Sequence, residues 1–193
     1  MPDALEHAMP MALAITSADA SATTALATAA AIKAVRIGLG ARAVEQNGEI
    51  APGDTMTAQY SIPFCVAACL TGDIRDPRTF DAQGLRDPAV AGMIPRIALY
   101  TDPEMEAVFP GKFAARVEIE TIDGRRFTET LMDAHGTPGD PCEEAEITDK
   151  FRLMCASVLD ENAIDETLRA IAGLRGAGGV NALSLALRRA KAG

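Results

Sequence analysis

The sequence predicts an α+β protein, in which an antiparallel sheet carries helices packed on one face and further helices follow at the C-terminus. Three observations favour this fold class. Short segments alternate polar and apolar residues, as half-buried strands do. Asp-Pro and Ser-Ile-Pro sequences are typical of helix starts. After residue 142, apolar residues recur at helical spacing.

The composition allows a sizeable core and limits the possible partners. Hydrophobic residues make up 48% of the 193 residues but aromatic residues only 4%, so the core must consist mainly of aliphatic side chains. The net charge of -9 and the lack of any basic run longer than a pair argue against nucleic acid. The sequence has no apolar stretch near the roughly 20 residues that cross a bilayer, and no charged signal-peptide region. We therefore expect a cytoplasmic protein without nucleic-acid or membrane partners.

The first part of the chain is predicted to be an Ala-rich helical segment, residues 1–32, with a mobile arm as the alternative. The alternation in residues 33–40 then predicts a strand at 34–39. The Gly- and Pro-rich stretch 46–54 is predicted to be a loop.

A helix is predicted within residues 58–73, because Ser61 can cap it, Pro63 suits its first turn and Gly72 can end it. Two short helices are predicted after Asp76-Pro77 and Asp87-Pro88 for the same reason.

Further strands are predicted at 96–101, 115–121 and 126–131, the last two joined as a hairpin near Asp123-Gly124. A two-residue turn would place Glu118 opposite Glu129, which is unfavourable. We prefer a three-residue loop that pairs Val117 with Leu131 and Thr121 with Phe127. Arg116, Glu118 and Glu120 alternate with apolar residues and should face solvent.

A loop is predicted at 133–142 and helices beyond it, with one apolar face formed by Ile147, Phe151, Met154 and Val158. Glycines at 173, 176, 178 and 179 interrupt the helical pattern. The predicted organisation is thus a helical N-terminal segment 1–32, a domain 33–135 that contains the strands and a helical segment 136–193.

Four segments of the chain resemble the MmgE/PrpD family of dehydratases, decarboxylases and epimerases, in its C-terminal lid portion. They are AQYSIPFCVAACLTGD at 58–73, LRDPAV at 85–90, PGKFAARVEIETIDGRRF at 110–127 and the run from GTPGDP to ITDKFR at 136–152. The resemblance covers residues 33 to about 165. It implies an α/β lid followed by helices that close on a helical domain.

The resemblance also implies a function. Family enzymes act without a metal or organic cofactor on small polycarboxylic acids, and their acid–base residues come mostly from the helical domain. The 193 residues hold no segment similar to that domain. We therefore expect a lid-type subunit of a lyase or isomerase that needs a separate helical catalytic chain and is inactive alone. The alternatives are a non-catalytic binding or assembly module, and an independent isomerase or lyase with a site across a homodimer. A homo-oligomer is expected if no helical chain binds.

The best substrate-binding candidates are Gln59, Tyr60 and Ser61, because free N–H groups at a helix start attract a carboxylate. The alternative is that Ser61 only caps the helix and Tyr60 packs in the core. Catalytic residues are not assigned, since His7 and His135 both suit ordinary surface positions. With two His and no Cys-x-x-Cys pair, no metal site is expected. The four cysteines, Cys65, Cys69, Cys142 and Cys155, are expected to be reduced thiols, the first two as buried hydrophobic residues.

Overall fold

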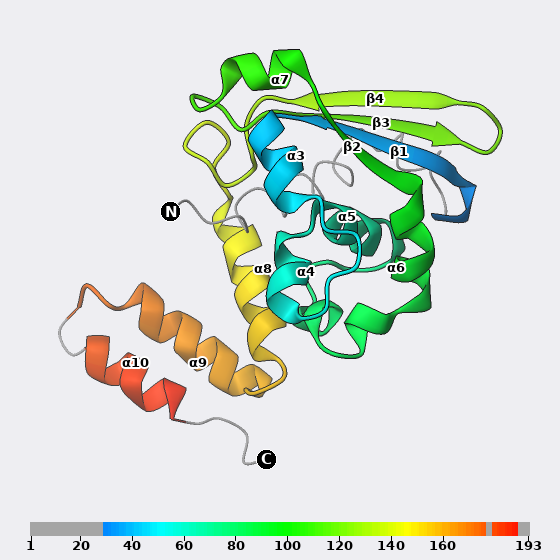
Figure 1. The fold of residues 1–193 in the computed structure, drawn as a ribbon. Helices are drawn as coiled ribbons and strands as arrows, with labels where there is room; N and C mark the ends of the chain where they lie inside the picture. Colours follow the sequence, from blue (N-terminus) through cyan, green and yellow to red (C-terminus); the bar gives the residue numbers. More distant parts are fainter. Residues whose placement is uncertain (1–28, 177–178, 189–193) are drawn as a thin grey trace. The chain divides into compact units, whose positions relative to one another are not determined.

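The computed structural model describes residues 29–176 and 179–188, which belong to two compact units that divide between Pro141 and Cys142 (Figure 1). The predicted helical segment 1–32 lies mostly outside the described residues. Within it, Ala29–Ala31 form a 3-10 turn, η1, and Ile32 begins the first strand. The described residues contain no helix that is long and apolar enough to cross a membrane.

The first unit contains a four-stranded sheet in the order β2-β1-β3-β4, which confirms the α+β fold class. Its strands are β1 (Ile32–Leu39), β2 (Ile97–Thr101), β3 (Ala115–Thr121) and β4 (Arg126–Leu131). The sheet is mixed, because β1 pairs with β2 in parallel while the other two pairings are antiparallel. The prediction of a wholly antiparallel sheet was wrong at this one pairing. The connection 40–96 is long enough to return the chain to the end where β1 starts, as parallel pairing requires.

The β3–β4 hairpin has the predicted three-residue loop but a different register. Val117 pairs with Glu129 and Ile119 with Phe127, and the N–H of Thr121 donates to the carbonyl of Arg125 at 3.0 Å. The loop is therefore residues 122–124. Gly124 ends the loop with a φ of +84°, a conformation that side chains disfavour. The register that we had preferred would have put Arg125 at that position, so the glycine decides the pairing.

Helices connect the strands of the first unit. They are α3 (Ala41–Asn47), α4 (Thr55–Tyr60), α5 (Ile62–Thr71), η2 (Pro77–Phe80), η3 (Gly84–Arg86), α6 (Pro88–Met93), η4 (Ile94–Arg96) and α7 (Pro103–Val108). The predicted starts at Asp76, Asp87 and Ser61 are confirmed, because each side chain accepts a backbone N–H of its helix. Asp102 caps α7 in the same way at a third Asp-Pro start, which was not among the predicted helices. Helices α3 and α4 were not predicted either.

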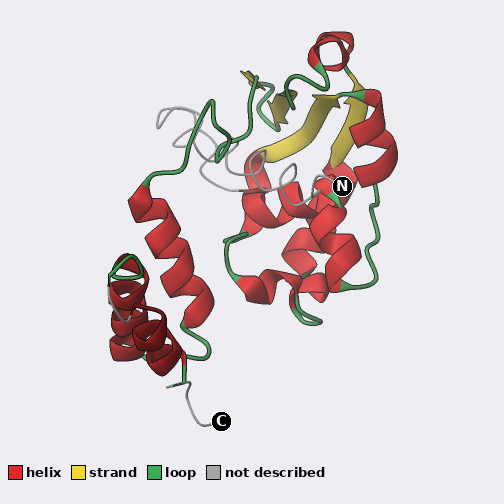
Figure 2. Cartoon of the chain, turned by 90° about the vertical axis from the view of Figure 1, so that its left-hand side faces the viewer, coloured by secondary structure: helices red, strands yellow, loops and turns green. Residues whose placement is uncertain are grey.

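The core of the first unit lies between the sheet and α5. Every residue of α5 from Ile62 to Cys69 is buried, so this helix is apolar all round, as a central helix is. It belongs to one hydrophobic cluster with the inward side chains of the strands, which include Val35, Ile37, Val117 and Ile119. Figures 1 and 2 show α3 to α6 on one side of the sheet. The other face carries the polar side chains of β1 and β3.

The cysteines differ in how far their thiols are removed from water. Cys65 and Cys69 are buried in α5, and burial raises the pKa of Cys65 to about 12 and that of Cys69 to about 11. The neighbouring negative charge of Cys69 raises the pKa of Cys65 further, and that of Asp73 raises the pKa of Cys69 further. Cys142 is exposed and Cys155 is partly exposed.

This difference predicts the order in which the thiols react. At about pH 8, iodoacetamide should alkylate Cys142 quickly and should leave Cys65 and Cys69 unmodified until denaturant is added, because the thiolate is the reactive form. Mass spectrometry of peptides would measure the labelling. Raised native pKa values also mean that folding stability falls as the pH rises above the ordinary thiol pKa towards 11 and 12. Labelling of Cys65 in the native protein at the rate of Cys142 would contradict this prediction.

The described residues of the second unit form three helices, α8 (Glu144–Cys155), α9 (Glu161–Ala172) and α10 (Gly179–Leu187). Asp160 caps α9 by accepting the N–H of Ala163 at 2.9 Å. A small core of Leu159, Ala163 and Ile164 joins α8 to α9, and α10 packs along α9. The predicted helices and their interruption by glycines near residue 176 are confirmed. The first of these helices, however, ends at Cys155, before Val158 of the predicted apolar face.

Candidate functional site

The three residues predicted to bind substrate lie where α4 ends and α5 begins. Gln59 and Tyr60 form the end of α4 and are half-buried, whereas Ser61 is fully buried. The Ser61 hydroxyl accepts the N–H of Phe64 at 3.0 Å and donates to the carbonyl of Glu49. The amide of Asn47 donates to the carbonyl of Tyr60 at 3.0 Å. Ser61 is thus a helix cap that also holds the preceding loop.

This geometry limits what the start of α5 can offer to an anion. Pro63 has no N–H, and the N–H of Phe64 is already bonded to Ser61. Binding of a carboxylate by Gln59, Tyr60 and Ser61 stays a prediction. The half-buried side chains of Gln59 and Tyr60 are the groups of the three that a ligand could reach.

The structure brings together a second set of polar residues, on the outer face of the sheet. Arg116 on β3 donates to Asp102 at 2.7 Å and to Glu104 at 2.5 Å. The Asp102 side chain is only 3% exposed, and its other oxygen accepts the N–H of Glu104 at 2.9 Å. The hydrogen bond to Glu104 raises the pKa of Arg116, and the charge of Asp102 adds to this effect. Arg116 therefore neutralises a nearly buried carboxylate and ties α7 to the sheet.

Beside Arg116, an aromatic ring and an ion pair occupy the same outer face. The hydroxyl of Tyr100 donates to Glu118 at 2.8 Å, and Arg36 pairs with the same carboxylate at 3.0 Å. The Arg36 guanidinium also lies over the Tyr100 ring, 4.7 Å from its centroid, in a cation–π contact. Burial, aided by the bond to Glu118, raises the pKa of Tyr100, so its phenol stays protonated at neutral pH. The Tyr100 ring lies close against Gly38, which leaves no space there for a side chain.

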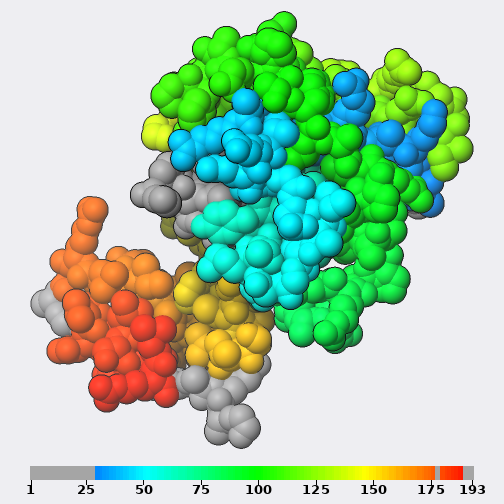
Figure 3. Space-filling model, in the orientation of Figure 1, coloured from blue at the N-terminus to red at the C-terminus, as the bar shows by residue number. Residues whose placement is uncertain are grey.

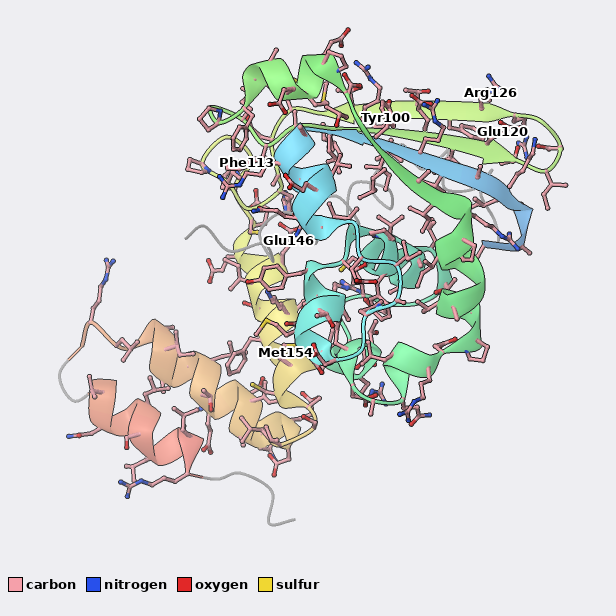
Figure 4. The ribbon with its side chains drawn as sticks, viewed as in Figure 1. Tyr100, Phe113, Glu120, Arg126, Glu146 and Met154 are labelled. Carbon is pink, nitrogen blue, oxygen red and sulfur yellow. The ribbon has the colours of Figure 1, made fainter. Side chains whose placement is uncertain are left out.

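Towards the hairpin end of the sheet, the pattern of paired charges continues. Lys33 pairs with Glu120 at 2.6 Å, and Arg126 approaches the other oxygen of Glu120 at 3.4 Å. Figure 4 labels Tyr100, Glu120 and Arg126 along the sheet. The hydrogen bond and charge of Lys33 hold the pKa of Glu120 below its usual range. Among the described residues of this face, Lys33, Arg36, Arg116 and Arg126 therefore each have a carboxylate partner within the chain.

An open depression of about 720 Å³ lies in the segment that connects α5 to α6. Its polar lining includes Asp76, Asp81 and Asp87, whose carboxylates accept backbone N–H groups of the following turns. Arg78 pairs with Asp76 at 2.5 Å. Because these carboxylates cap local turns, the depression is built by loop structure.

His135 does not belong to either polar set. His135 lies in the predicted loop 133–142, where its Nδ1 is 3.0 Å from a carboxylate oxygen of Asp140. His7 lies outside the described residues. Sequence reasoning missed the outer-face residues Asp102 and Tyr100. The one available signal was the alternation of Arg116, Glu118 and Glu120, which do lie on the outer face as predicted.

Comparison with known proteins identifies the family. The model of the MmgE/PrpD C-terminal domain matches residues 6–174, which is most of the chain. A comparison with curated proteins finds no significant match. The mixed sheet, the Ser61-capped central helix and the Asp-Pro helix starts all fall within the matched region. This chain therefore belongs to the MmgE/PrpD family, of which it carries the C-terminal domain.

Proposed function

We propose that this chain is the lid-type part of an MmgE/PrpD-like lyase or isomerase that acts on small polycarboxylic acids. A separate helical catalytic chain supplies the acid–base residues and the cations that hold the substrate carboxylates. The reaction needs no metal or organic cofactor. Four free thiols support an intracellular, reducing location such as the cytoplasm.

The pairing of charges on the outer face of the sheet carries this proposal. Moving a proton next to a carboxylate requires a base, an acid and cations that stabilise the developing charge. On the outer face, Lys33, Arg36, Arg116 and Arg126 are all paired with the chain's own carboxylates. A polycarboxylate would have to displace those partners, and the net charge of -9 opposes its approach. The missing positive charge must therefore come from a partner.

The same pairing also favours a second candidate, a binding or assembly module that kept the fold without the chemistry. The two functions differ in one measurable outcome. A lid-type subunit restores turnover when a helical chain of the family is added, whereas an assembly module binds without turnover.

The test is an activity assay with methylcitrate-like and aconitate-like acids. We expect no turnover by the purified chain alone and measurable dehydration, decarboxylation or epimerisation after mixing with a purified helical-domain chain of the family. Turnover by the chain alone, abolished by His7→Ala, would contradict the proposal and favour an independent enzyme. Complex formation without turnover would favour the assembly module.

Variants of the predicted binding residues sharpen the assay. Gln59→Ala and Tyr60→Phe should raise KM of the mixed enzyme on the order of tenfold if these side chains hold a substrate carboxylate. Gln83→Ala is the control, because this exposed residue lines the separate depression. Equal effects of Gln59→Ala and Gln83→Ala on KM would exclude Gln59 from the substrate site.

A further inference from the structure

Strand β4 is an edge of the sheet with free backbone groups. Among the described strands it pairs only with β3, and Figure 3 shows this hairpin, in yellow-green, at the surface. The N–H of Thr121 donates to the carbonyl of Arg125 at 3.0 Å, and hydrogen-bonded pairs recur at every second residue of an antiparallel ladder. The groups of β4 that bond to β3 therefore belong to odd-numbered residues. Those on the free edge belong to Arg126, Thr128 and Thr130.

The side chains of β4 on the inner face of the sheet combine two apolar groups with one charge. Phe127 and Leu131 are half-buried and lie opposite core residues of β3. Glu129 lies between them, opposite the buried Val117. It is exposed, and its carboxylate has no ion-pair partner among the described residues. The inner face of this edge therefore offers two apolar positions with an unpaired negative charge between them.

An added antiparallel strand would continue this pattern. Its residue opposite Glu129 would occupy a non-hydrogen-bonded position, where the two Cα atoms are only about 4.5 Å apart and the side chains approach closely. An uncharged residue there would cover the Glu129 carboxylate without pairing it, which is unfavourable. A Lys or Arg would pair with it, while aliphatic residues two positions away on either side would cover Phe127 and Leu131.

We propose that the free edge of β4 binds an extended segment of a partner protein in which Lys or Arg lies between two aliphatic residues at alternate positions. Backbone hydrogen bonds to the edge supply affinity, and Glu129 with its apolar neighbours supplies specificity, as in other cases of strand addition. An inward-pointing charge also protects an edge from uncharged strands, so Glu129 rejects non-specific partners. This contact is separate from the proposed lyase or isomerase activity and does not depend on it.

Peptide binding to the full chain, measured by fluorescence anisotropy, tests the inference. The probes are the peptides Val-Thr-Lys-Thr-Val-Thr and Val-Thr-Glu-Thr-Val-Thr, which carry the same dye and differ only at the residue that would face Glu129. We expect the Lys peptide to bind at least about tenfold more tightly than the Glu peptide. Equal binding of the two peptides, or no binding of the Lys peptide at about 1 mM, would overturn the inference.

Variants of the chain locate the site. Glu129→Lys should reverse the preference, so that the Glu peptide binds about tenfold more tightly than the Lys peptide. Glu45→Lys is the matched control and should keep the wild-type preference, because Glu45 is exposed on α3, which packs on β2 at the opposite edge of the sheet. Thr128→Pro removes an N–H from the free edge but none that bonds to β3, so it should abolish binding of both peptides.

Circular dichroism would verify that each variant keeps its secondary structure. A preference for the Lys peptide that persists in Glu129→Lys, or binding that persists in Thr128→Pro, would place the peptide elsewhere on the chain and overturn the inference. Loss of the preference in Glu45→Lys would overturn it as well, because net charge and not Glu129 would then select the peptide.

Discussion

Replacement of Arg116 by Met is expected to lower the free energy of unfolding by about 3 kcal/mol. The substitution keeps most of the aliphatic length of the side chain but removes the guanidinium that pairs with Asp102 at 2.7 Å. Asp102 is 2% exposed, so its carboxylate would remain out of water without its cation. The remaining hydrogen bond from the N–H of Glu104 cannot replace a full charge. Urea denaturation at neutral pH, followed by circular dichroism, measures the change.

The matched control is Arg126→Met on the neighbouring strand. The Arg126 side chain is 79% exposed, and its nitrogen is 3.4 Å from Glu120, which also pairs with Lys33. Exposed pairs of this kind contribute less than about 1 kcal/mol, so this variant should be close to wild type. If both substitutions had the same effect, the buried pair would not be the reason for the loss at Arg116.

Substitution of Gly38 by Ala is expected to destabilise the fold by about 2 kcal/mol, because the site is already filled. A Cβ atom at this position would lie 2.7 Å from the Tyr100 Cζ and Oη atoms and 2.9 Å from the Asp102 Cβ. Moving the Tyr100 ring would disturb its bond to Glu118 and its contact with Arg36. Asp102 cannot move easily, since it pairs with Arg116 and caps α7. Thermal and urea unfolding would both report the loss.

Substitution of Gly92 by Ala, in the same unit, is expected to stabilise the fold. Gly92 lies inside α6, and no atom comes within 4 Å of a Cβ built there, so Ala should raise stability by about 0.5–1 kcal/mol.

Combining Gly38→Ala with Tyr100→Val should lower the free energy of unfolding by less than the sum of the two single changes, since removal of the ring makes room for the methyl group. Additive effects in that pair would mean that Tyr100 is not what excludes a side chain at position 38.

Local sequence signals predicted most of the fold. Alternation located the four strands within a residue or two, and Ser or Asp followed by Pro located the starts of α5, η2 and α6. These signals work because capping and pleating depend on neighbours in the chain. The same rule applied to Asp102-Pro103 would have found α7. The short helices α3 and α4 were missed because the Gly- and Pro-rich stretch around them favours a loop.

The hairpin shows how one residue can decide among several local possibilities. Charge repulsion between Glu118 and Glu129 correctly excluded the two-residue turn, and the three-residue loop was correctly preferred. The predicted register was nevertheless wrong, because it placed Arg125 and not Gly124 at the last position of the loop. Since only glycine adopts its φ of +84° easily, Gly124 must be the last loop residue, and this sets every pair along the hairpin.

The sequence by itself determined the strands, the helix starts, the apolar faces of α5 and α8, and the resemblance to the family. All of these depend on residues close together in the chain. Only the tertiary structure decided that β1 and β2 run parallel, that Asp102 is buried beside Arg116, and that Tyr100 lies against Gly38 beneath Arg36. These contacts join residues on different elements. Their formation depends on strand direction and pairing, which long-range packing sets and short-range patterns do not encode.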